Sequence, residues 1–150
     1  MSKVLEIYTD GNCKGNQFNE NVGGWGAYLV FGKHTKKLNG AEVNTTNQRM
    51  ELTGCIKGLE AIKDRTVKTI VYLDSQYVFK GLTDWADKWK KNNWRKSDKK
   101  PVENKEYWEH LLELRDSFTN INFKKIKGHS GIEGNEIADS LASEAISNMD

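Results

Sequence analysis

The chain is poor in cysteine, in proline and in long apolar runs, and each shortage excludes a class of protein. Two cysteines in 150 residues, Cys13 and Cys55, cannot build a disulfide framework, and they lack the CxxC spacing of zinc sites. Free thiols are the default in a reducing cytoplasm, where we expect this protein. No apolar run approaches the ~18 residues of a membrane span. The N-terminus, MSKVLEIYTD, has no signal-peptide core, so we expect no membrane partner.

The chain also lacks repeats, low-complexity linkers and all but one proline, Pro101. We therefore expect one domain over residues 1–150. Its net charge of +2 is unevenly distributed: residues 80–100 hold eight basic and three acidic side chains, whereas residues 133–150 hold five acids and no Lys or Arg. A basic segment on a near-neutral chain indicates either a polyanionic partner or a solvated helical surface.

Hydrophobic periodicity predicts an α/β fold. Strands are expected at residues 4–8, 23–31, 36–43, 69–73 and 121–127, the first three as an antiparallel meander. Apolar side chains recur at helical spacing from residue 52 to 62, with Thr45 or Thr46 as the N-cap. Short helices are expected at 77–81 and 84–91, and longer ones at 104–117 and from about residue 135. This order predicts a five-stranded mixed sheet flanked by helices on both faces.

Four acids stand where such a sheet binds ligands. Asp10 is predicted to end the first strand and Asp74 the fourth. If these strands are parallel neighbours, both carboxylates face the crevice at their carboxyl ends. Glu51 lies near the start of the first long helix and Asp139 one turn into the last. Each acid alone has a structural explanation, but paired carboxylates repel and need a cation. Oxygen ligands without histidine select hard ions, Mg²⁺ or Mn²⁺.

Five segments together carry a family resemblance. In order they are YTDGNCKGN, TTNQRMEL, YLDSQYV, WKKNNWRKSDKKPVEN and IKGHSGIEGNEIAD. Their sequence and order resemble type I ribonuclease H over essentially the whole chain. The resemblance implies a ribonuclease H-like fold and metal-dependent endonucleolytic cleavage of the RNA strand of an RNA–DNA hybrid. It also implies that the chain is the catalytic domain alone and acts as a monomer.

The resemblance assigns the catalytic residues. Asp10, Glu51, Asp74 and Asp139 match the carboxylates that hold two Mg²⁺ ions, for which Mn²⁺ is a possible substitute. Asp10 is expected to bridge the ions, and the glycines after it to let the RNA backbone approach closely. His129, in the GHSG loop, matches a histidine that carries protons near the attacking water. Water attack on phosphorus would leave 5′-phosphate and 3′-hydroxyl ends.

The substrate-binding residues follow from the same match. The polar side chains expected to contact the RNA strand are Asn16, Asn47, Gln48 and Gln76, with the Cys13 region. Thr46 and Asn104 match a pocket for a phosphate of the DNA strand, a contact that fixes position. Beside that pocket relatives can offer an arginine, where this chain has Asn44.

The segment DWADKWKKNNWRKSDKK resembles the basic protrusion of the family. Trp85 and Trp89 lie four residues apart on one helical face, and core packing explains them better than stacking on bases. The cationic side chains then remain available for phosphates: Lys88, Lys90, Lys91, Arg95 and Lys96.

Three other kinds of protein share part of this pattern. A response-regulator receiver also places aspartates at strand ends, but its fold needs a helical crossover after the first strand, where this chain predicts a hairpin. A DNA-acting recombinase or integrase shares the expected fold but usually needs additional DNA-binding domains. A non-catalytic hybrid-binding module would not need all four acids.

Overall fold

The fold is built on one five-stranded mixed sheet. The computed structural model describes residues 3–14, 21–128 and 131–149. The strand order is β3-β2-β1-β4-β5, with antiparallel pairs on the β1–β2–β3 side and parallel pairs from β1 through β4 to β5. The predicted mixed sheet and its initial meander are confirmed. The strands are β1 (Leu5–Lys14), β2 (Val22–Phe31), β3 (His34–Val43), β4 (Thr69–Leu73) and β5 (Ile121–Lys125).

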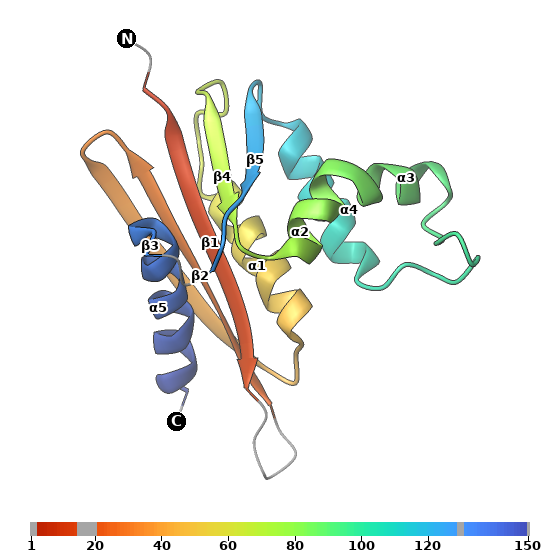
Figure 1. The fold of residues 1–150 in the computed structure, drawn as a ribbon, viewed down its shortest axis with the longest axis horizontal. Coiled ribbons are helices and arrows are strands. Elements are labelled where there is room, and N and C mark those ends of the chain that lie inside the picture. The colour runs from red at the N-terminus through yellow and green to blue at the C-terminus, as the bar shows by residue number, and fades with distance from the viewer. Residues whose placement is uncertain (1–2, 15–20, 129–130, 150) are drawn as a thin grey trace.

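Helices cover both faces of the sheet, as the sequence predicted (Figure 1). On one face α1 (Asn47–Glu60) packs on β1 and β2, and α4 (Lys105–Asp116) packs on α1. The core lies here, around side chains with no exposed surface such as Ile7, Leu59 and Trp108. On the other face α5 (Glu133–Ser147) crosses β1, β2 and β3. None of the described helices is long and apolar enough to cross a membrane.

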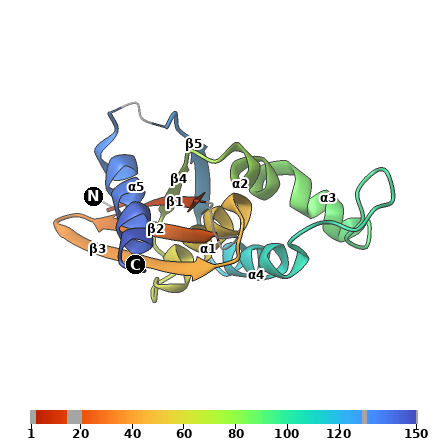
Figure 2. The same cartoon turned by 90° about the horizontal axis from the view of Figure 1, so that it is seen from below.

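The segment after β4 forms an arm that projects from the sheet (Figure 2). It consists of α2 (Gln76–Lys80), a π-helical turn η1 (Gly81–Trp85) and α3 (Ala86–Lys91), followed by a loop to α4. The π-helical turn passes close to α4: a Cβ on Gly81 would lie 2.0 Å from the Trp108 ring. The Trp108 ring also meets Trp89 edge-on, with 5.7 Å between centroids. Trp89 and Trp108 therefore connect the arm to the core, as the packing interpretation predicted for Trp89. The same interpretation was wrong for Trp85, which is exposed.

Several boundaries differ from those predicted. β1 continues four residues beyond Asp10, because residues 10–14 remain paired with β2, so Asp10 lies inside the strand rather than at its end. β5 ends at Lys125, two residues early, and α5 begins at Glu133, two residues early. The hydroxyl of Thr46, rather than of Thr45, caps α1 by accepting from the Arg49 N–H.

Candidate active site

Asp10 and Asp74 lie side by side on neighbouring strands. The parallel pairing of β1 with β4 ends at Thr9 opposite Leu73. Asp10 directly follows Thr9, and Asp74 directly follows Leu73. Side chains alternate along β1: Ile7 and Thr9 are buried on the α1 side, and Asp10 is half-buried on the opposite face. The two carboxylates therefore share one edge of the sheet, although Asp10 does not end its strand.

Glu51 reaches the same edge because α1 approaches β1 very closely. A Cβ on Gly11 would lie 2.2 Å from the backbone N of Glu51 and from the backbone C of Met50. Only glycine leaves room for this approach. The expectation that this glycine makes room for an RNA backbone is therefore wrong for Gly11, whose free space is filled by α1.

Asp139 comes from the opposite face of the sheet, in the second turn of α5. The helix rests directly on two glycines of β2: a Cβ on Gly26 would lie 2.3 Å from the Ala138 carbonyl oxygen, and one on Gly24 equally close to that of Ala142. The Asn39 side chain of β3 also donates to the Leu141 carbonyl, at 2.8 Å. These contacts fix α5, and with it Asp139, against β2 and β3.

The four carboxyl groups influence one another. Burial, the nearby charge of Asp74 and a hydrogen bond with Asp139 raise the pKa of Asp10 to about 8. Burial also raises the pKa of Glu51; the charge of Asp74 adds to this, and a hydrogen bond from the Ser75 hydroxyl opposes it. In the described part of the chain, no group of three His, Cys, Asp or Glu side chains is arranged to hold a metal ion. The carboxyl groups interact in pairs, with Asp10 and Asp139 sharing a hydrogen bond.

Two of the predicted site residues, His129 and Asn16, lie outside the described residues. The chain that leads to His129 runs beside the carboxylates: a Cβ on Gly128 would lie 3.2 Å from Oδ2 of Asp74. Ile126, just before it, donates its N–H to the Leu73 carbonyl at 2.8 Å. Gly128, the residue before His129 in the sequence, therefore lies next to Asp74.

The predicted RNA-strand contacts lie at the starts of α1 and α2. Asn47 and Gln48 occupy the first two positions of α1, and Gln76 is the first residue of α2; all three side chains are exposed. Cys13 is half-buried near the end of β1, and its thiol lies 3.7 Å from the Thr45 carbonyl just before α1.

Thr46 and Asn104, the predicted phosphate pocket, are joined by Arg49. The Arg49 backbone N–H donates to the Thr46 hydroxyl, and its Nε donates to Oδ1 of Asn104, each at 3.1 Å. Asn104 adopts a left-handed backbone (φ 60°) at the start of α4. Sequence reasoning did not single out Arg49, or Ser75 beside Glu51. For Arg49 the signal was an arginine one helical turn after the cap, in TTNQRMEL.

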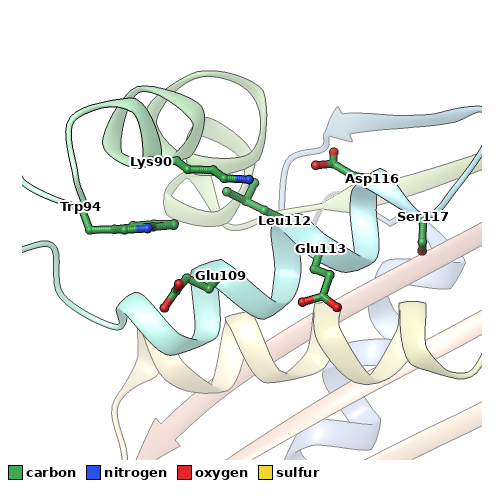
Figure 3. A pocket seen from close by; sticks show the side chains of 7 residues that line it. All are labelled: Lys90, Trp94, Glu109, Leu112, Glu113, Asp116 and Ser117. Carbon is green, nitrogen blue, oxygen red and sulfur yellow. The ribbon is translucent and has the colours of Figure 1, made fainter.

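The basic residues of the arm do not lie on one surface. Lys88, Arg95 and Lys96 line a hollow of about 480 Å³ with Trp85, a residue that is 37% exposed. Lys90 lines a different hollow, of about 420 Å³, between α3 and α4. Figure 3 shows Lys90 reaching toward Leu112 of α4. Three acidic residues of α4 also line this hollow: Glu109, Glu113 and Asp116.

Comparison with known proteins places the chain in a family. The model of the RNase H family matches residues 2–147. The chain belongs to the ribonuclease H family. Ribonuclease H of Dichelobacter nodosus is 47% identical over 146 residues, which cover 97% of this chain and 94% of that protein.

Solved ribonuclease H structures share the fold. LC9-RNase H1, described as a type 1 RNase H with the type 2 active-site motif, superposes with a TM-score of 0.85 at 27% identity; the match covers all of this chain and 75% of that one. LC11-RNase H1, solved in complex with an RNA/DNA hybrid, superposes with a TM-score of 0.71 at 22% identity, covering 97% and 98% of the two chains. The resemblance to type I ribonuclease H found in the sequence is thus confirmed over nearly the full length.

Proposed function

We propose that this ribonuclease H hydrolyses the RNA strand of RNA–DNA hybrids at the edge of the sheet where Asp10, Asp74, Glu51 and Asp139 meet. The observation that carries the proposal is the placement of Asp10 beside Asp74, directly after the last residues paired between β1 and β4. Relatives nearly half identical over almost the whole chain bear the name ribonuclease H, and a protein of the same fold was solved with an RNA/DNA hybrid.

The chemistry of these four side chains suits Mg²⁺, but they must first rearrange, because no three such groups among the described residues are arranged to hold an ion. All four side chains offer carboxylate oxygens, the ligands that hard cations prefer. Without a cation, ionisation of Asp10 is unfavourable, because burial, Asp74 and Asp139 raise its pKa to about 8. Two divalent ions, Mg²⁺ or in its place Mn²⁺, would supply an acidified water and charge stabilisation at the phosphate and the leaving 3′ oxygen. The products would carry 5′-phosphate and 3′-hydroxyl ends.

The carboxylates would hold these ions in two groups. Asp10 is the proposed bridging ligand, because it lies between Asp74 on the neighbouring strand and Asp139 on α5. Asp74 and Glu51 would complete one ion's set, and Asp139 the other. To bind the ions, Asp10 must lose its proton and its hydrogen bond with Asp139. His129 would carry a proton near the attacking water; Gly128, the residue before it in the sequence, lies next to Asp74.

Substrate contacts would come from the polar residues around the starts of α1, α2 and α4. The RNA strand would be recognised through its 2′-hydroxyls by side chains that can donate and accept: Cys13, Asn16, Asn47, Gln48 and Gln76. Thr46 and Asn104 would hold a phosphate of the DNA strand. Arg49 is added to this pocket because it already joins Thr46 to Asn104, and it offers the guanidinium that the chain lacks at Asn44.

We also propose that residues 1–150 form a single catalytic domain that acts as a monomer in the cytoplasm. The sheet and helices α1 to α4 share one hydrophobic core, α5 packs on the other face of the same sheet, and both cysteines are free thiols. The two rival functions, DNA cleavage of the recombinase or integrase type and hybrid binding without catalysis, are decided by the substrate that is cut.

The test uses labelled RNA as a hybrid, as duplex RNA and as a single strand, with matched duplex DNA, each with and without Mg²⁺. We expect cleavage of the hybrid alone, and only with the metal. Asp10→Asn and Asp74→Asn should fall below about one-hundredth of wild-type turnover, since even the partners of metal ligands contribute 10–100-fold. Hybrid affinity should change little, because the groove contacts remain.

Glu113→Gln, which removes an acid on the far side of α4, is the matched control and should keep wild-type turnover. Retention of more than about a tenth of turnover by Asp10→Asn at saturating Mg²⁺ would contradict the metal assignment, because it exceeds even the loss expected for a partner of a ligand. Cleavage of duplex DNA, or binding of hybrid without any cleavage, would favour one of the rivals.

A further inference from the structure

Three tyrosines form a row across the sheet, and two of them precede Asp10 and Asp74 by two residues. Tyr8 of β1 is directly opposite Tyr28 of β2 and Tyr72 of β4. The rings of Tyr8 and Tyr72 are stacked, with 4.6 Å between centroids and 11° between planes. The rings of Tyr8 and Tyr28 are further apart, at 6.4 Å, and tilted by 33°. The close pair therefore joins the two strands that lead to Asp10 and Asp74.

The stacked pair and the two aspartates share one face of the sheet. Side chains two residues apart point to the same side of a strand, so Asp10 follows Tyr8 on this face, and Asp74 follows Tyr72 just past the end of β4. The β1–β4 pairing ends at Thr9 and Leu73. The tyrosine rings are thus the last paired side chains on this face before two carboxylates whose charges push them apart.

Tyr8 also supports the helix that carries Asp139. A Cβ on Gly134, in the first turn of α5, would lie 2.4 Å from Cδ1 and Cε1 of the Tyr8 ring. The helix therefore starts directly against the ring, which leaves no space between them. A second tie joins β1 to β4, since the Tyr72 hydroxyl donates to Oε2 of Glu6 at 3.1 Å.

We propose that Tyr8 and Tyr72 are positioning residues for the metal site. Their stacked rings hold β1, β4 and the start of α5 at fixed distances, and so set the spacing of Asp10, Asp74 and Asp139. The inference rests on the proposed function and deepens it: the pair tunes Mg²⁺ affinity and turnover, whereas hybrid binding depends on residues elsewhere. The stack itself, rather than the Tyr72 hydroxyl, carries most of the effect.

The row supplies its own matched control. Tyr28 belongs to the same row and is half-buried like its neighbours, but β2 carries none of the four carboxylates. Tyr72→Thr and Tyr28→Thr each remove one tyrosine ring from the row, and threonine suits a strand at both positions. Tyr72→Phe keeps the ring and removes only the hydrogen bond to Glu6. Tyr72→Leu, a second variant, removes the ring but retains apolar bulk should Tyr72→Thr fail to fold.

The measurements are Mg²⁺ binding to the substrate-free protein by titration calorimetry, and kcat and KM on a hybrid. Removing a group that directly orients a metal ligand costs about 10–100-fold in metal affinity or activity. Tyr8 and Tyr72 act less directly, through the spacing of the strands that carry the ligands. Tyr72→Thr and Tyr72→Leu should therefore weaken Mg²⁺ binding about 3–10-fold. Their kcat should fall and KM should stay unchanged. Tyr72→Phe and Tyr28→Thr should match wild type in Mg²⁺ affinity.

Equal weakening in Tyr28→Thr would overturn the proposal, because it would reduce the effect to general stability. So would wild-type Mg²⁺ affinity in both Tyr72→Thr and Tyr72→Leu. These failures differ from failure of the proposed function. If the wild-type protein neither binds Mg²⁺ nor cleaves hybrids, both ideas fall; if it does both and Tyr72→Thr and Tyr72→Leu bind Mg²⁺ with wild-type affinity, only the positioning role falls.

Discussion

Asp10 is an ionisable group whose charge opposes folding when no cation is present. Burial, Asp74 and Asp139 raise its pKa from 3.8 to about 8. In the folded, metal-free protein it stays protonated up to about that pH, whereas in the unfolded chain it ionises near pH 4. The unfolded state therefore gains from ionisation between these values, and Asp10 lowers stability progressively as the pH rises from about 4 to about 8.

Asp10→Asn should for this reason be more stable than wild type in EDTA at pH 8. One pKa unit corresponds to about 1.4 kcal/mol, and partial relaxation of the site reduces the total, so we expect a gain of ~1–3 kcal/mol in the free energy of unfolding. The gain should shrink toward pH 4. Urea denaturation at both pH values measures it.

Mg²⁺ should stabilise wild type more than it stabilises Asp10→Asn. A cation that binds only the folded state raises the melting temperature of wild type, and Asp10→Asn, which lacks one ligand charge, should respond less. Glu113→Gln is the control for simple loss of an acid and should follow wild type. If Asp10→Asn is less stable than wild type at every pH, Asp10 stabilises β1 instead of holding a cation.

The position of α5 depends on glycines in β2. A Cβ on Gly26 would meet the Ala138 carbonyl oxygen at 2.3 Å and Cβ of Leu141 at 2.8 Å. Backbone cannot yield as a flexible side chain can, so Gly26→Ala must push the helix outward. Overpacking of this kind costs about 1–3 kcal/mol. Because Asp139 follows Ala138, turnover should fall as well.

Gly58→Ala offers a comparison on the other face of the sheet. The nearest atom to a Cβ there is a methyl carbon of Ile7 at 3.1 Å, and alanine favours the helix that contains it. Melting temperature and kcat should therefore change much less than in Gly26→Ala. A Gly26→Ala protein with the stability and turnover of wild type would show that α5 is not fixed by this contact.

The spacing of apolar residues predicted those strands and helices whose side chains follow a regular apolar pattern. The apolar run of β4 and the helical spacing from Leu52 to Ile62 located a strand and a helix, and the four acids followed from their motifs. The end of β1 was misplaced because residues 11–14 have no apolar alternation, and they are a strand only through pairing with β2. The tyrosine row escaped notice for the same reason, since Tyr8 meets Tyr72 only through the register of β1 with β4.

The sequence likewise could not predict on which side of the arm each basic residue lies. α3 is anchored to α4 by Arg115, whose guanidinium forms two hydrogen bonds with the Asp87 carboxylate, at 2.9 and 3.1 Å. This contact lowers the pKa of Asp87, mainly through the hydrogen bonds from Arg115. On α3 in this orientation, Lys90 lines the hollow between α3 and α4, whereas Lys88 lines the hollow beside Trp85.

The side of the arm that faces a nucleic acid should therefore be the side of Lys88, Arg95 and Lys96. Replacing these three residues with glutamine should weaken hybrid binding and raise KM, while saturated turnover stays near wild type. Each phosphate contact contributes about 0.7–0.9 to the slope of log affinity against log salt, so three lost contacts should flatten that slope by roughly 2–3. Binding isotherms across a range of salt concentrations measure it.

Lys90→Gln is the matched control, because it removes a lysine of the same arm that lines the other hollow, together with Glu109, Glu113 and Asp116. Its salt slope and KM should equal those of wild type. The triple variant should approach wild-type affinity at high salt, where the lost contacts contribute little. It should lose affinity for duplex DNA as well, since phosphates carry no ribose information, and still cleave only RNA in a hybrid. An unchanged slope in the triple variant would mean that the basic arm is a solvated helical surface, with the phosphates bound elsewhere.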